Sequence, residues 1–524
     1  MSPTEQEVNS PSSRTFDTPT LLFLLAALIF LYPSLFVFPF IPIDHHGDGT
    51  IYLSDGMRIY EGEVMYRDFF QFSTPGTALS YFLLFKVFGP RLWIPDLALL
   101  LLGLGLAWLG VVIAKKVMRP SLALLPSAIF LVGVYQNQLD ATHHWYSLLT
   151  ATAALASLME RRTPARIAAA GFFCALTACF TQSRGLAAVM GFGAFLWWES
   201  RRRQEDWREL LKKEAWLVGS FLATIMGVNA YFVWKAGLTR FLWCTVVFGI
   251  KYYPKQADAN TWLVFTLNLP EFEWLSNFRL HFMRWLFLYA VIPSTYILFF
   301  ARYRRECGKG PMEFWERPML LAVVGSFMLL GVAPAPSFPR MATSALPGFI
   351  LLGWFTDPQR KLGRSLAGVL TVGILLVVPY GVARSQSIKV SIFATPQGKL
   401  AEREGDQGAY EEYTWVQHHT RPSEYLYEPG DADMYFSLSL RNPTPLPFVT
   451  NNGYTTPEQV MDVIRGLQQH PVHYIVWSHQ WLEVIPDWEE PSDDHLGPLR
   501  DYIQRHYHVV KVFTNSDKIW ERND

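Results

Sequence analysis

Long uncharged stretches alternate with short charged ones through the first 384 residues of the chain. A helix needs roughly 20 apolar residues to cross the hydrocarbon core of a bilayer. On this pattern we predict about eleven membrane-spanning helices. They centre on residues 18–43, 97–114, 121–135, 145–159, 167–182, 185–198, 215–234, 285–301, 318–334, 341–356 and 365–383. The apolar stretch 74–88 is too short to cross, and we predict that it forms an interfacial helix.

The pattern changes at about residue 385, where the apolar segments become short and are separated by polar turns. This pattern predicts a small soluble α/β domain, with a helix that starts at Pro457, because proline favours the first helical position. We expect strands at 425–428, 473–477, 509–513 and 518–520, and helices at 457–469 and 499–506. The Ser-, Pro- and Thr-rich residues 1–17 are predicted to be disordered. The predicted organisation is therefore a tail (1–17), a transmembrane domain (18–384) with its first outward loop at 44–92, and a soluble domain (385–524).

Composition and charge support this division. Half of the 524 residues are hydrophobic and only 17% are charged, which is typical of a membrane protein. The net charge is zero, but residues 385–524 hold 11 Lys and Arg against 21 Asp and Glu, so this part carries −10 and the remainder +10. No overall basic field remains that would favour a nucleic-acid partner. The four cysteines include no C-x-x-C pair, so neither a disulfide framework nor a thiolate zinc site is expected.

The position of the basic residues predicts the orientation in the membrane. Lys and Arg collect in alternate loops, at 115–119, 161–166, 201–213, 302–309 and 360–364. Because short positively charged loops remain in the cytoplasm, we place these five loops and the N terminus on the cytoplasmic side. The first loop and the C-terminal domain then face outward.

Polar residues of the outward loops are the candidates for chemistry, and we expect them to converge on one outer cavity. They are Asp44, Asp48, Tyr52, Arg58, Arg67 and Asp68 in the first loop, Asp140, His143 and His144 in the second, and Arg184, Lys251 and Arg340 in later ones. An acid beside such cations can pair a hydroxyl-activating base with an anion site, since the planar fork of Arg suits phosphate oxygens.

Other interpretations of these residues remain open. Asp48 could cap the helix that follows it, and Asp140, His143 and His144 could have capping or interface roles. The histidines and carboxylates could also supply ligands for a divalent metal. However, adjacent histidines point in different directions and the spacing is not a zinc signature, so a metal is the minority interpretation.

Several short motifs lie in the first loop and beyond it. They are Asp48 with Tyr52, Glu61-Gly62, Tyr66-Arg67-Asp68-Phe69-Phe70, Thr74-Pro75-Gly76 and Phe85 to Gly89, followed more weakly by Gln182 to Gly185 and by Arg340 ahead of Leu346-Pro347. In this pattern the chain resembles the GT-C superfamily of polytopic glycosyltransferases, the relatives of aminoarabinose lipid A transferases and protein O-mannosyltransferases. The resemblance covers residues 1–384. It implies a GT-C-like fold, a polyprenyl-phosphate sugar as donor, membrane lipids as surroundings, and a place in the bacterial inner (plasma) membrane.

The resemblance also implies roles for individual residues. Asp48 would be the loop acid that deprotonates the acceptor, while Arg184 and Arg340 would hold the lipid phosphate; the role of Asp44, a second acid, is open. The chain departs from the family at Gly49, where Glu is common, and at Ser73-Thr74, where relatives with a metal have Glu. No cofactor is firmly implied, although a divalent metal is possible.

The resulting hypothesis is a hexosyl or pentosyl transferase that moves a sugar from a polyprenyl-phosphate carrier to a hydroxyl of an acceptor, such as a lipid or glycan, at the outer face of the membrane. Two alternatives belong to other classes. One is a membrane transporter or lipid-carrier flippase, whose site would lie near the midplane among ionisable residues within spans. The other is a non-catalytic scaffold whose outward domain binds a partner.

Overall fold

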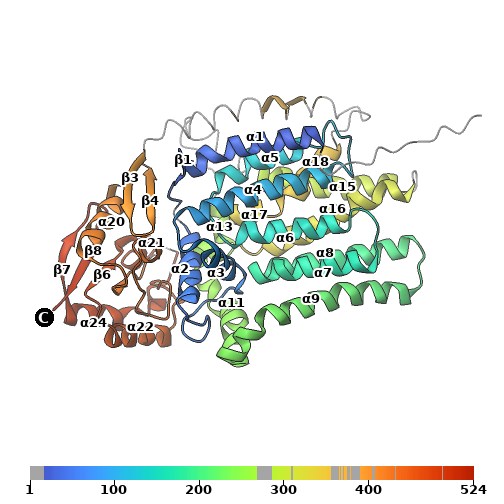
Figure 1. Cartoon of the computed structure of the whole chain (residues 1–524). Helices are drawn as coiled ribbons and strands as arrows, with labels where there is room; N and C mark the ends of the chain where they lie inside the picture. Colours follow the sequence, from blue (N-terminus) through green and yellow to red (C-terminus); the bar gives the residue numbers. More distant parts are fainter. Residues whose placement is uncertain are drawn as a thin grey trace, which may run out of the picture.

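A bundle of long helices carries a smaller α/β unit at one end in the computed structural model of the chain (Figure 1). The structure describes residues 17–45, 47–267, 286–307, 311–355, isolated positions between 365 and 378, and residues 390–403, 407–430, 432–486 and 488–523. Most of the predicted tail 1–17 therefore lies outside the described residues. We call the helical part (17–378) the body and the α/β unit (390–523) the tail domain. Together they have the predicted fold class, a helical polytopic protein with a C-terminal α/β domain.

In the described part of the chain, ten helices of between 9 and 30 residues form the bundle of the body. They are α1 (Thr18–Leu35), α4 (Trp93–Ala114), α5 (Leu125–Gly133), α6 (His143–Ser157), α7 (Pro164–Phe180), α8 (Gln182–Arg202), α9 (Trp207–Ala236), α15 (Ile292–Glu306), α16 (Met312–Val332) and α18 (Ala345–Phe355). Within the described residues, α1, α4, α9 and α16 are long and apolar enough to cross a membrane. Each predicted span up to residue 356 corresponds to one of these helices, although α5 begins only at Leu125, with Pro126 in its first turn. The span 365–383 lies mostly outside the described residues, and the number of spans stays a prediction.

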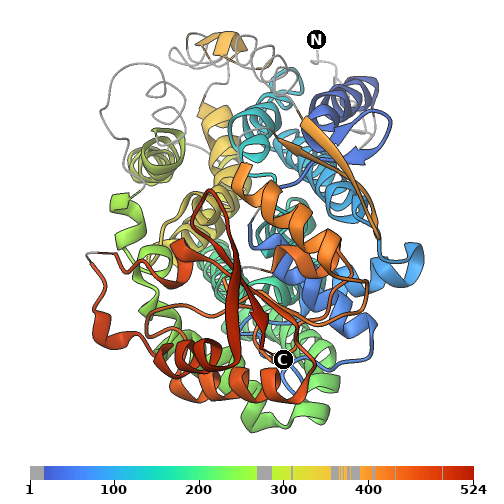
Figure 2. The same cartoon turned by 90° about the vertical axis from the view of Figure 1, so that its left-hand side faces the viewer.

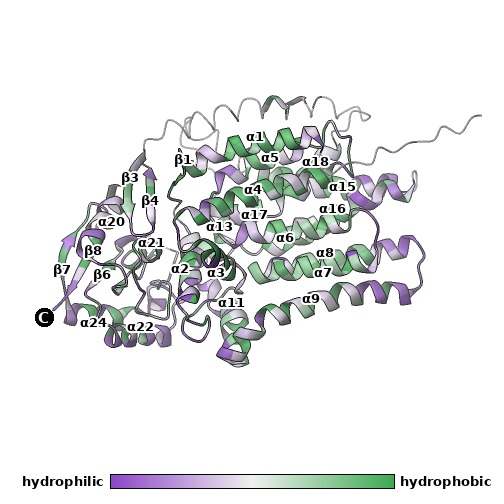
Figure 3. Ribbon diagram, in the orientation of Figure 1, coloured by the Kyte–Doolittle hydropathy of each residue, from purple (hydrophilic) through white to green (hydrophobic). Residues whose placement is uncertain are grey.

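The basic loops lie at the end of the bundle that is farthest from the tail domain. Figure 3 shows hydrophilic residues gathered where α7, α8, α9, α15 and α16 turn, and apolar residues along the helices between the two ends. Part of this charge is paired, since Arg162 lies 3.1 Å from the buried carboxylate of Glu199. The four basic loops that the structure describes at least in part thus share one end, as the alternation of spans predicts.

Shorter elements cover the opposite end of the body. After the two-residue strands β1 (Phe36–Val37) and β2 (Ile41–Pro42), the first loop forms α2 (Gly49–Tyr60) and α3 (Gly76–Phe88), and α3 matches the predicted short helix. Further short helices are α10 (Leu238–Leu242), α11 (Phe248–Lys251), α12 (Ala257–Asn260), α13 (Leu263–Leu267) and α17 (Phe338–Ala342), with single helical turns at 135–137, 243–247, 253–255 and 286–291.

The tail domain is built on a four-stranded sheet in the order β5-β6-β8-β7, which faces the viewer in Figure 2. The strands are β5 (Leu426–Tyr427), β6 (Tyr474–Trp477), β7 (Tyr507–Val512) and β8 (Lys518–Arg522); β5 and β6 are parallel and the other pairs antiparallel. Its helices are α20 (Gln407–His419), α21 (Asp433–Ser437), α22 (Pro457–Gln469), α23 (His479–Leu482) and α24 (Gly497–His506), with a helical turn at 491–493. The predicted helix 457–469 is α22, which Thr456 and Gln459 close with a capping box. A hairpin of β3 (Val390–Thr395) and β4 (Gly398–Arg403), as well as α20 and α21, were not predicted.

The tail domain and the first loop form one packed unit. A single hydrophobic cluster includes Phe69 and Phe70 of the loop, Phe248 of α11, and Val449 and Tyr454 of the tail domain. The backbone N–H of Phe70 also donates to the carbonyl of Pro445 at 2.7 Å. The tail domain therefore packs in a fixed position against the first loop.

Candidate active site

A cavity of about 330 Å³ lies where α2, α6, α12 and α17 meet the tail domain. Its lining includes Asp48, Tyr52, Gln71, His143, His144, Tyr253, Asn260 and Arg340 from the body. The tail domain contributes Leu446, Pro447, Phe448, Val449, Tyr454 and Trp481. The structure thus brings together five residues that the sequence analysis proposed: Asp48, Tyr52, His143, His144 and Arg340. We call this space the Asp48 cavity.

Asp48 precedes α2, but its side chain does not cap the helix. The cap comes from Asp140 instead, whose Oδ1 accepts a hydrogen bond from the backbone N–H of Gly49 at 3.0 Å. Gly49 permits this contact, because a Cβ at this position would lie only 2.5 Å from the same oxygen. The capping interpretation of Asp48 is therefore wrong, and the carboxylate of Asp48 remains available to the cavity.

The side chain of Asp48 can be reached from the cavity, but its surroundings have low polarity. Its side chain is exposed to the space of the cavity, yet protein atoms surround that space on several sides. Burial of this kind raises the pKa of Asp48, and the positive charge of Arg340 acts in the opposite direction. A carboxylate with a raised pKa binds a proton more strongly, which suits a general base.

Arg340 of α17 is held by neutral acceptors. Its Nη1 donates to the carbonyl oxygens of Ala259 at 2.8 Å and Ala335 at 3.2 Å. Its Nη2 donates to the hydroxyl of Tyr253 and to Oδ1 of Asn260, each at 2.7 Å. Among the described residues, no carboxylate lies within ion-pair distance of this guanidinium. Its position is fixed while its charge stays unneutralised, as an anion site requires.

Arg184 of α8 lies behind the cavity wall rather than in it. Its guanidinium is buried, with Nη1 donating to Oγ of Ser147 and Nη2 to Nδ1 of His144, both at 2.7 Å. When Nδ1 of a neutral histidine accepts, Nε2 carries the proton, so Arg184 keeps His144 as a donor. The predicted role of Arg184 at a phosphate would therefore act through His144.

The remaining predicted residues lie elsewhere. Asp44 and Asp140 line a second cavity on the other side of Gly49. Arg58, Arg67 and Asp68 line a third one. There Arg58 pairs with Glu63, and Arg67 with Asp68, each at 2.7 Å. Lys251 is exposed and rests on the ring of Tyr252.

Sequence reasoning missed two groups of residues at the site. The apolar wall from the tail domain carries no motif, because Phe448, Tyr454 and Trp481 resemble ordinary core residues in the sequence. Tyr253 and Asn260, which hold Arg340, lie about 80 residues before it in the chain, and no local pattern links them. As for a metal, no three His, Cys, Asp or Glu side chains of the described residues are grouped so that they could hold one.

The chain is similar to known proteins in its structure but matches none by sequence. No protein-family pattern matches the chain, and no match is found among curated proteins. ArnT from Cupriavidus metallidurans, solved with undecaprenyl phosphate, is 10% identical with a TM-score of 0.57, over 95% of this chain and 97% of its own. Archaeal oligosaccharyltransferase AglB from Archaeoglobus fulgidus, solved with an inhibitory peptide and a dolichol-phosphate, is 12% identical with a TM-score of 0.52, over 97% and 74%.

This chain has a GT-C fold. The resemblance noted in the first loop is thereby confirmed, and the agreement covers nearly the whole chain, including the tail domain. Together with its apolar helices, the GT-C fold makes the chain an integral membrane protein. In this fold the Asp48 cavity lies between the short elements of the body and the tail domain.

Proposed function

We propose that this GT-C chain is a glycosyltransferase that moves a sugar from a polyprenyl-phosphate carrier to a hydroxyl of an acceptor. The proposal rests on one observation above all: Asp48 and the unneutralised Arg340 face the same cavity. An acid and a cation in one partly dry space supply the two charges that such a transfer needs. The polyprenyl phosphates bound by the similar GT-C structures are in line with this chemistry.

The reaction uses each residue for one task. The carboxylate of Asp48 takes the proton from the acceptor hydroxyl as its oxygen attacks the anomeric carbon. The bond between that carbon and the phosphate oxygen breaks, and the carrier phosphate leaves with the electron pair. Arg340 stabilises the negative charge that develops on the phosphate, at a position that Tyr253 and Asn260 fix beforehand. Because attack and departure occur on opposite faces, the configuration at the anomeric carbon inverts.

The surroundings of the cavity suit a lipid-linked donor. The isoprenoid chain of the carrier requires a bilayer, which the apolar helices of the body occupy. The aromatic and aliphatic wall of the tail domain keeps water away from the reacting sugar, a hexose or a pentose.

Replacement of Asp48 tests the proposal. Asp48→Asn keeps the shape of the side chain and removes the base, so transfer from a radiolabelled polyprenyl-phosphate sugar should fall to background. The melting temperature of the purified protein should stay unchanged. Glu61→Gln, at an exposed acid of the same loop, is the matched control and should keep full activity. Transfer retained by Asp48→Asn would refute the assignment.

The same assay separates the enzyme from the two alternatives. A transporter or flippase, or a scaffold, should release no free polyprenyl phosphate from the labelled donor. Sustained release by the native protein that depends on an added acceptor supports the transferase.

The proposal also places the site on the outer face of a bacterial inner membrane, with the N terminus in the cytoplasm. The basic loops at the far end of the bundle support this orientation. A reporter enzyme fused after residue 524, active only outside the cytoplasm, should be active. A cytoplasmic signal from this fusion would contradict the location of the site.

A further inference from the structure

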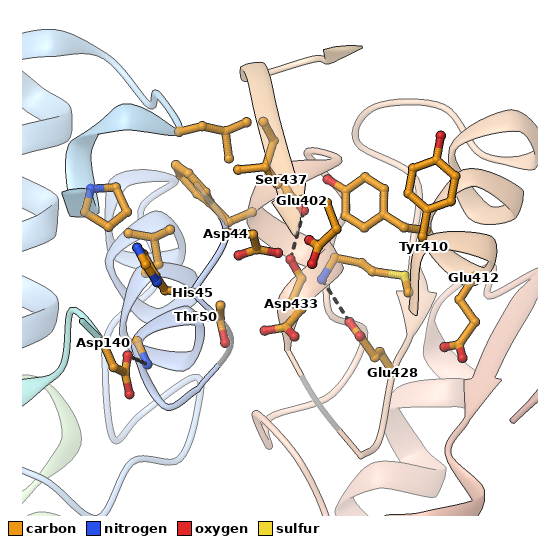
Figure 4. Close-up of a pocket in the computed structure, with 18 of the residues that line it drawn as sticks. Asp44, His45, Thr50, Asp140, Glu402, Tyr410, Glu412, Glu428, Asp433 and Ser437 are labelled. Atoms are coloured by element: carbon orange, nitrogen blue, oxygen red, sulfur yellow. Dashed lines mark hydrogen bonds between the residues drawn. The ribbon is translucent and has the colours of Figure 1, made fainter. Parts of the chain in front are cut away.

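The third cavity, of about 550 Å³, lies where the first loop and α10 meet the tail domain, and arginines outnumber acids in its lining. The arginines are Arg58, Arg67 and Arg240 from the body and Arg441 and Arg465 from the tail domain, and the acids are Glu61, Glu63, Asp68 and Asp462. The lining thus carries one net positive charge. The second cavity differs, because Figure 4 shows carboxylates such as Asp44 and Asp140 in its lining, and no described lysine or arginine lines it.

Three of the four acids of the third cavity are already paired with arginines of the same cavity. The pairs are Arg58 with Glu63, Arg67 with Asp68, and Arg465 with Asp462. Arg240 and Arg441 remain, and among the described residues no carboxylate lies within ion-pair distance of either guanidinium. The fourth acid, Glu61, is exposed to solvent, which screens its charge. The positive charge that is not neutralised therefore belongs to Arg240 and Arg441.

Arg240 of α10 is held by neutral groups. Its Nε donates to the carbonyl of Tyr66 in the first loop at 3.3 Å. Its guanidinium lies over the ring of Trp243, 5.0 Å from the ring centroid. Neither contact uses Nη1 or Nη2, so both terminal nitrogens can donate to a ligand. The side chain is thus oriented by the body while its charge stays available.

Arg441 of the tail domain has a fixed backbone and an exposed side chain. Its N–H donates to the carbonyl of Glu424 at 2.9 Å, and its carbonyl accepts from the N–H of Leu426 at 3.2 Å, next to β5. Its guanidinium makes no hydrogen bond or ion pair with any residue that the structure describes. Two arginines from distant parts of the chain therefore face one cavity with free donors, which is the arrangement that an anion site requires.

The position of Arg240 indicates where the anion comes from. The helix α9 is long and apolar enough to cross a membrane, and it ends at Ala236, where Gly237 turns the chain with a φ of 82°. The helix α10, with Arg240, follows directly, and Figure 1 shows this end of α9 on the side of the bundle that carries the tail domain. Trp234, which is exposed, and Trp243 lie on either side of the turn. Because tryptophans collect at the level of the lipid headgroups, Arg240 lies at the membrane surface.

We propose that the third cavity binds the phosphate of an anionic phospholipid headgroup, held by Arg240 of the body and Arg441 of the tail domain. The planar fork of arginine donates paired hydrogen bonds to phosphate oxygens. A phosphodiester carries one negative charge, which matches the net charge of the lining. The ammonium group of a zwitterionic headgroup would be repelled by the two arginines, so the site favours an anionic lipid.

The bound lipid would connect the two parts of the chain at the membrane surface, because each part supplies one arginine. Neither arginine lines the Asp48 cavity, so this site is separate from the proposed transfer. The inference thus goes beyond the transferase function and does not depend on it.

A binding experiment without donor or acceptor tests the proposal. Full-length protein in a neutral maltoside detergent at pH 7 is titrated by calorimetry, with protein-free micelles as the blank. The three ligands are dihexanoyl phosphatidylglycerol, dihexanoyl phosphatidylcholine and sodium phosphate. We expect the glycerol lipid to bind at least tenfold more tightly than the choline lipid, which has the same acyl chains, and more tightly than free phosphate.

Variants assign this preference to the two arginines. Arg240→Gln and Arg441→Gln should each weaken binding of the glycerol lipid severalfold, and together at least tenfold. Arg441→Lys keeps the charge and should lose less than Arg441→Gln. The matched control Arg505→Gln, at an exposed arginine of α24 outside the cavity, should bind as the native protein does. Because the side chain of Arg441 has no partner among the described residues, Arg441→Gln should also keep the native melting temperature in detergent.

A stability measurement gives a second readout in a bilayer. The native protein should melt at a higher temperature in nanodiscs that contain phosphatidylglycerol than in nanodiscs of phosphatidylcholine alone, since a ligand of the folded state stabilises it. This difference should disappear in Arg240→Gln with Arg441→Gln and persist in Arg505→Gln.

Four results would overturn the proposal. They are equal affinity for the two lipids, tight binding that the double variant retains, an equal loss in Arg505→Gln, and free phosphate that binds as tightly as the glycerol lipid. The last result would assign the cavity to a soluble phosphate compound instead of a lipid. None of these outcomes depends on the result for Asp48→Asn, because no sugar is transferred in either measurement.

Discussion

Two adjoining cavities of similar size face the same short stretch of backbone, residues 47–49, and differ in charge. The Asp48 cavity holds Arg340 and an apolar wall, whereas the second cavity, lined by Asp44 and Asp140, holds carboxylates from both parts of the chain. Asp140 lies at the boundary, where it caps α2 and lines the acidic side. One loop thus lines two cavities of different charge, because Gly47 and Asp48 face one cavity and Gly49 faces the other.

Removing the cation of the Asp48 cavity should have the largest effect on transfer. Arg340→Ala should lower kcat of transfer by about 10²–10³-fold, because the charge that develops on the phosphate loses its stabilisation. Arg340→Lys should recover only part of the rate, since an ammonium cannot reproduce the fork. Steady-state kinetics with a polyprenyl-phosphate sugar measures both. Lys251→Ala, at an exposed cation outside the cavity, should keep the native rate, and an equal loss there would point to a general effect of charge.

Gly49 lies in the backbone between the two cavities, where a single added methyl group should disturb the structure. Gly49→Ala places a Cβ against Oδ1 of Asp140, so we expect the helix cap to be displaced at a cost of about 1–3 kcal/mol. The melting temperature in detergent should fall by several degrees. In the double variant with Asp140→Ala the steric conflict is absent, so the two losses should be less than additive. Gly219→Ala, in open space on α9, should not lower the melting temperature.

The stability of the protein should depend on pH through a carboxyl group behind the wall of the Asp48 cavity. Gln71 lines this cavity and donates to the buried carboxyl of Asp55 at 2.7 Å. Burial raises the pKa of Asp55 to about 7, above the ordinary value near 4. Between these two values the unfolded chain releases its proton first, so stability is full below about pH 4 and falls as pH rises to about 7.

Asp55→Asn, which can still accept from Gln71, should flatten this slope and raise the melting temperature above pH 7. Thermal unfolding followed from pH 4 to pH 8 measures the effect. Asp501→Asn, at an exposed acid of α24, should leave the profile unchanged. If the dependence of melting temperature on pH persists in Asp55→Asn, another group must cause it.

We expect the smallest loss of stability from an exposed ion pair between the body and the tail domain. Lys255 of the body lies 3.0 Å from Asp493 of the tail domain, and both side chains are about half exposed. Exposed pairs contribute about 0–1 kcal/mol, so Lys255→Met should change the melting temperature by at most a few degrees and leave transfer intact. A large loss would mean that this pair, rather than the shared apolar cluster, holds the tail domain in place.

The local patterns of the sequence predicted much of the fold. Apolar stretches identified the bundle helices of the body up to residue 356, although not its shorter helices such as α12 and α17, and Pro457 correctly marked the start of α22. A helical period and a cap are properties of neighbouring residues, so they can be read from one segment. The hairpin of β3 and β4 was not predicted because its strands, VSIFAT and GKLAER, show no regular alternation of polar and apolar residues. In addition, β4 pairs with the first loop at Ile43, which is far away in the sequence.

The site was only partly predictable, because its contacts join distant segments. Asp48 and Arg340 stood out by residue type and motif. Asp68 belongs to another motif of the same loop, yet its carboxylate accepts from the N–H of Val64 and faces another cavity, since Tyr66 turns the loop with a positive φ. Likewise, nothing near Asp140 shows that it caps a helix 91 residues earlier in the chain. The direction in which a side chain points and the partner that it binds depend on the folded loop, so the spacing of residues in the sequence does not predict them.

The hydrophobic cluster shared by the first loop and the tail domain has a consequence for how such proteins diversify. Phe69, Phe70 and Tyr454 belong to one continuous core, so neither surface fits an unrelated partner. A chimera that received a foreign tail domain alone would expose the aromatic side of its own loop. Recombination between related chains should therefore succeed only when loop and tail domain are exchanged as a matched set, so these two distant parts of the gene should change together.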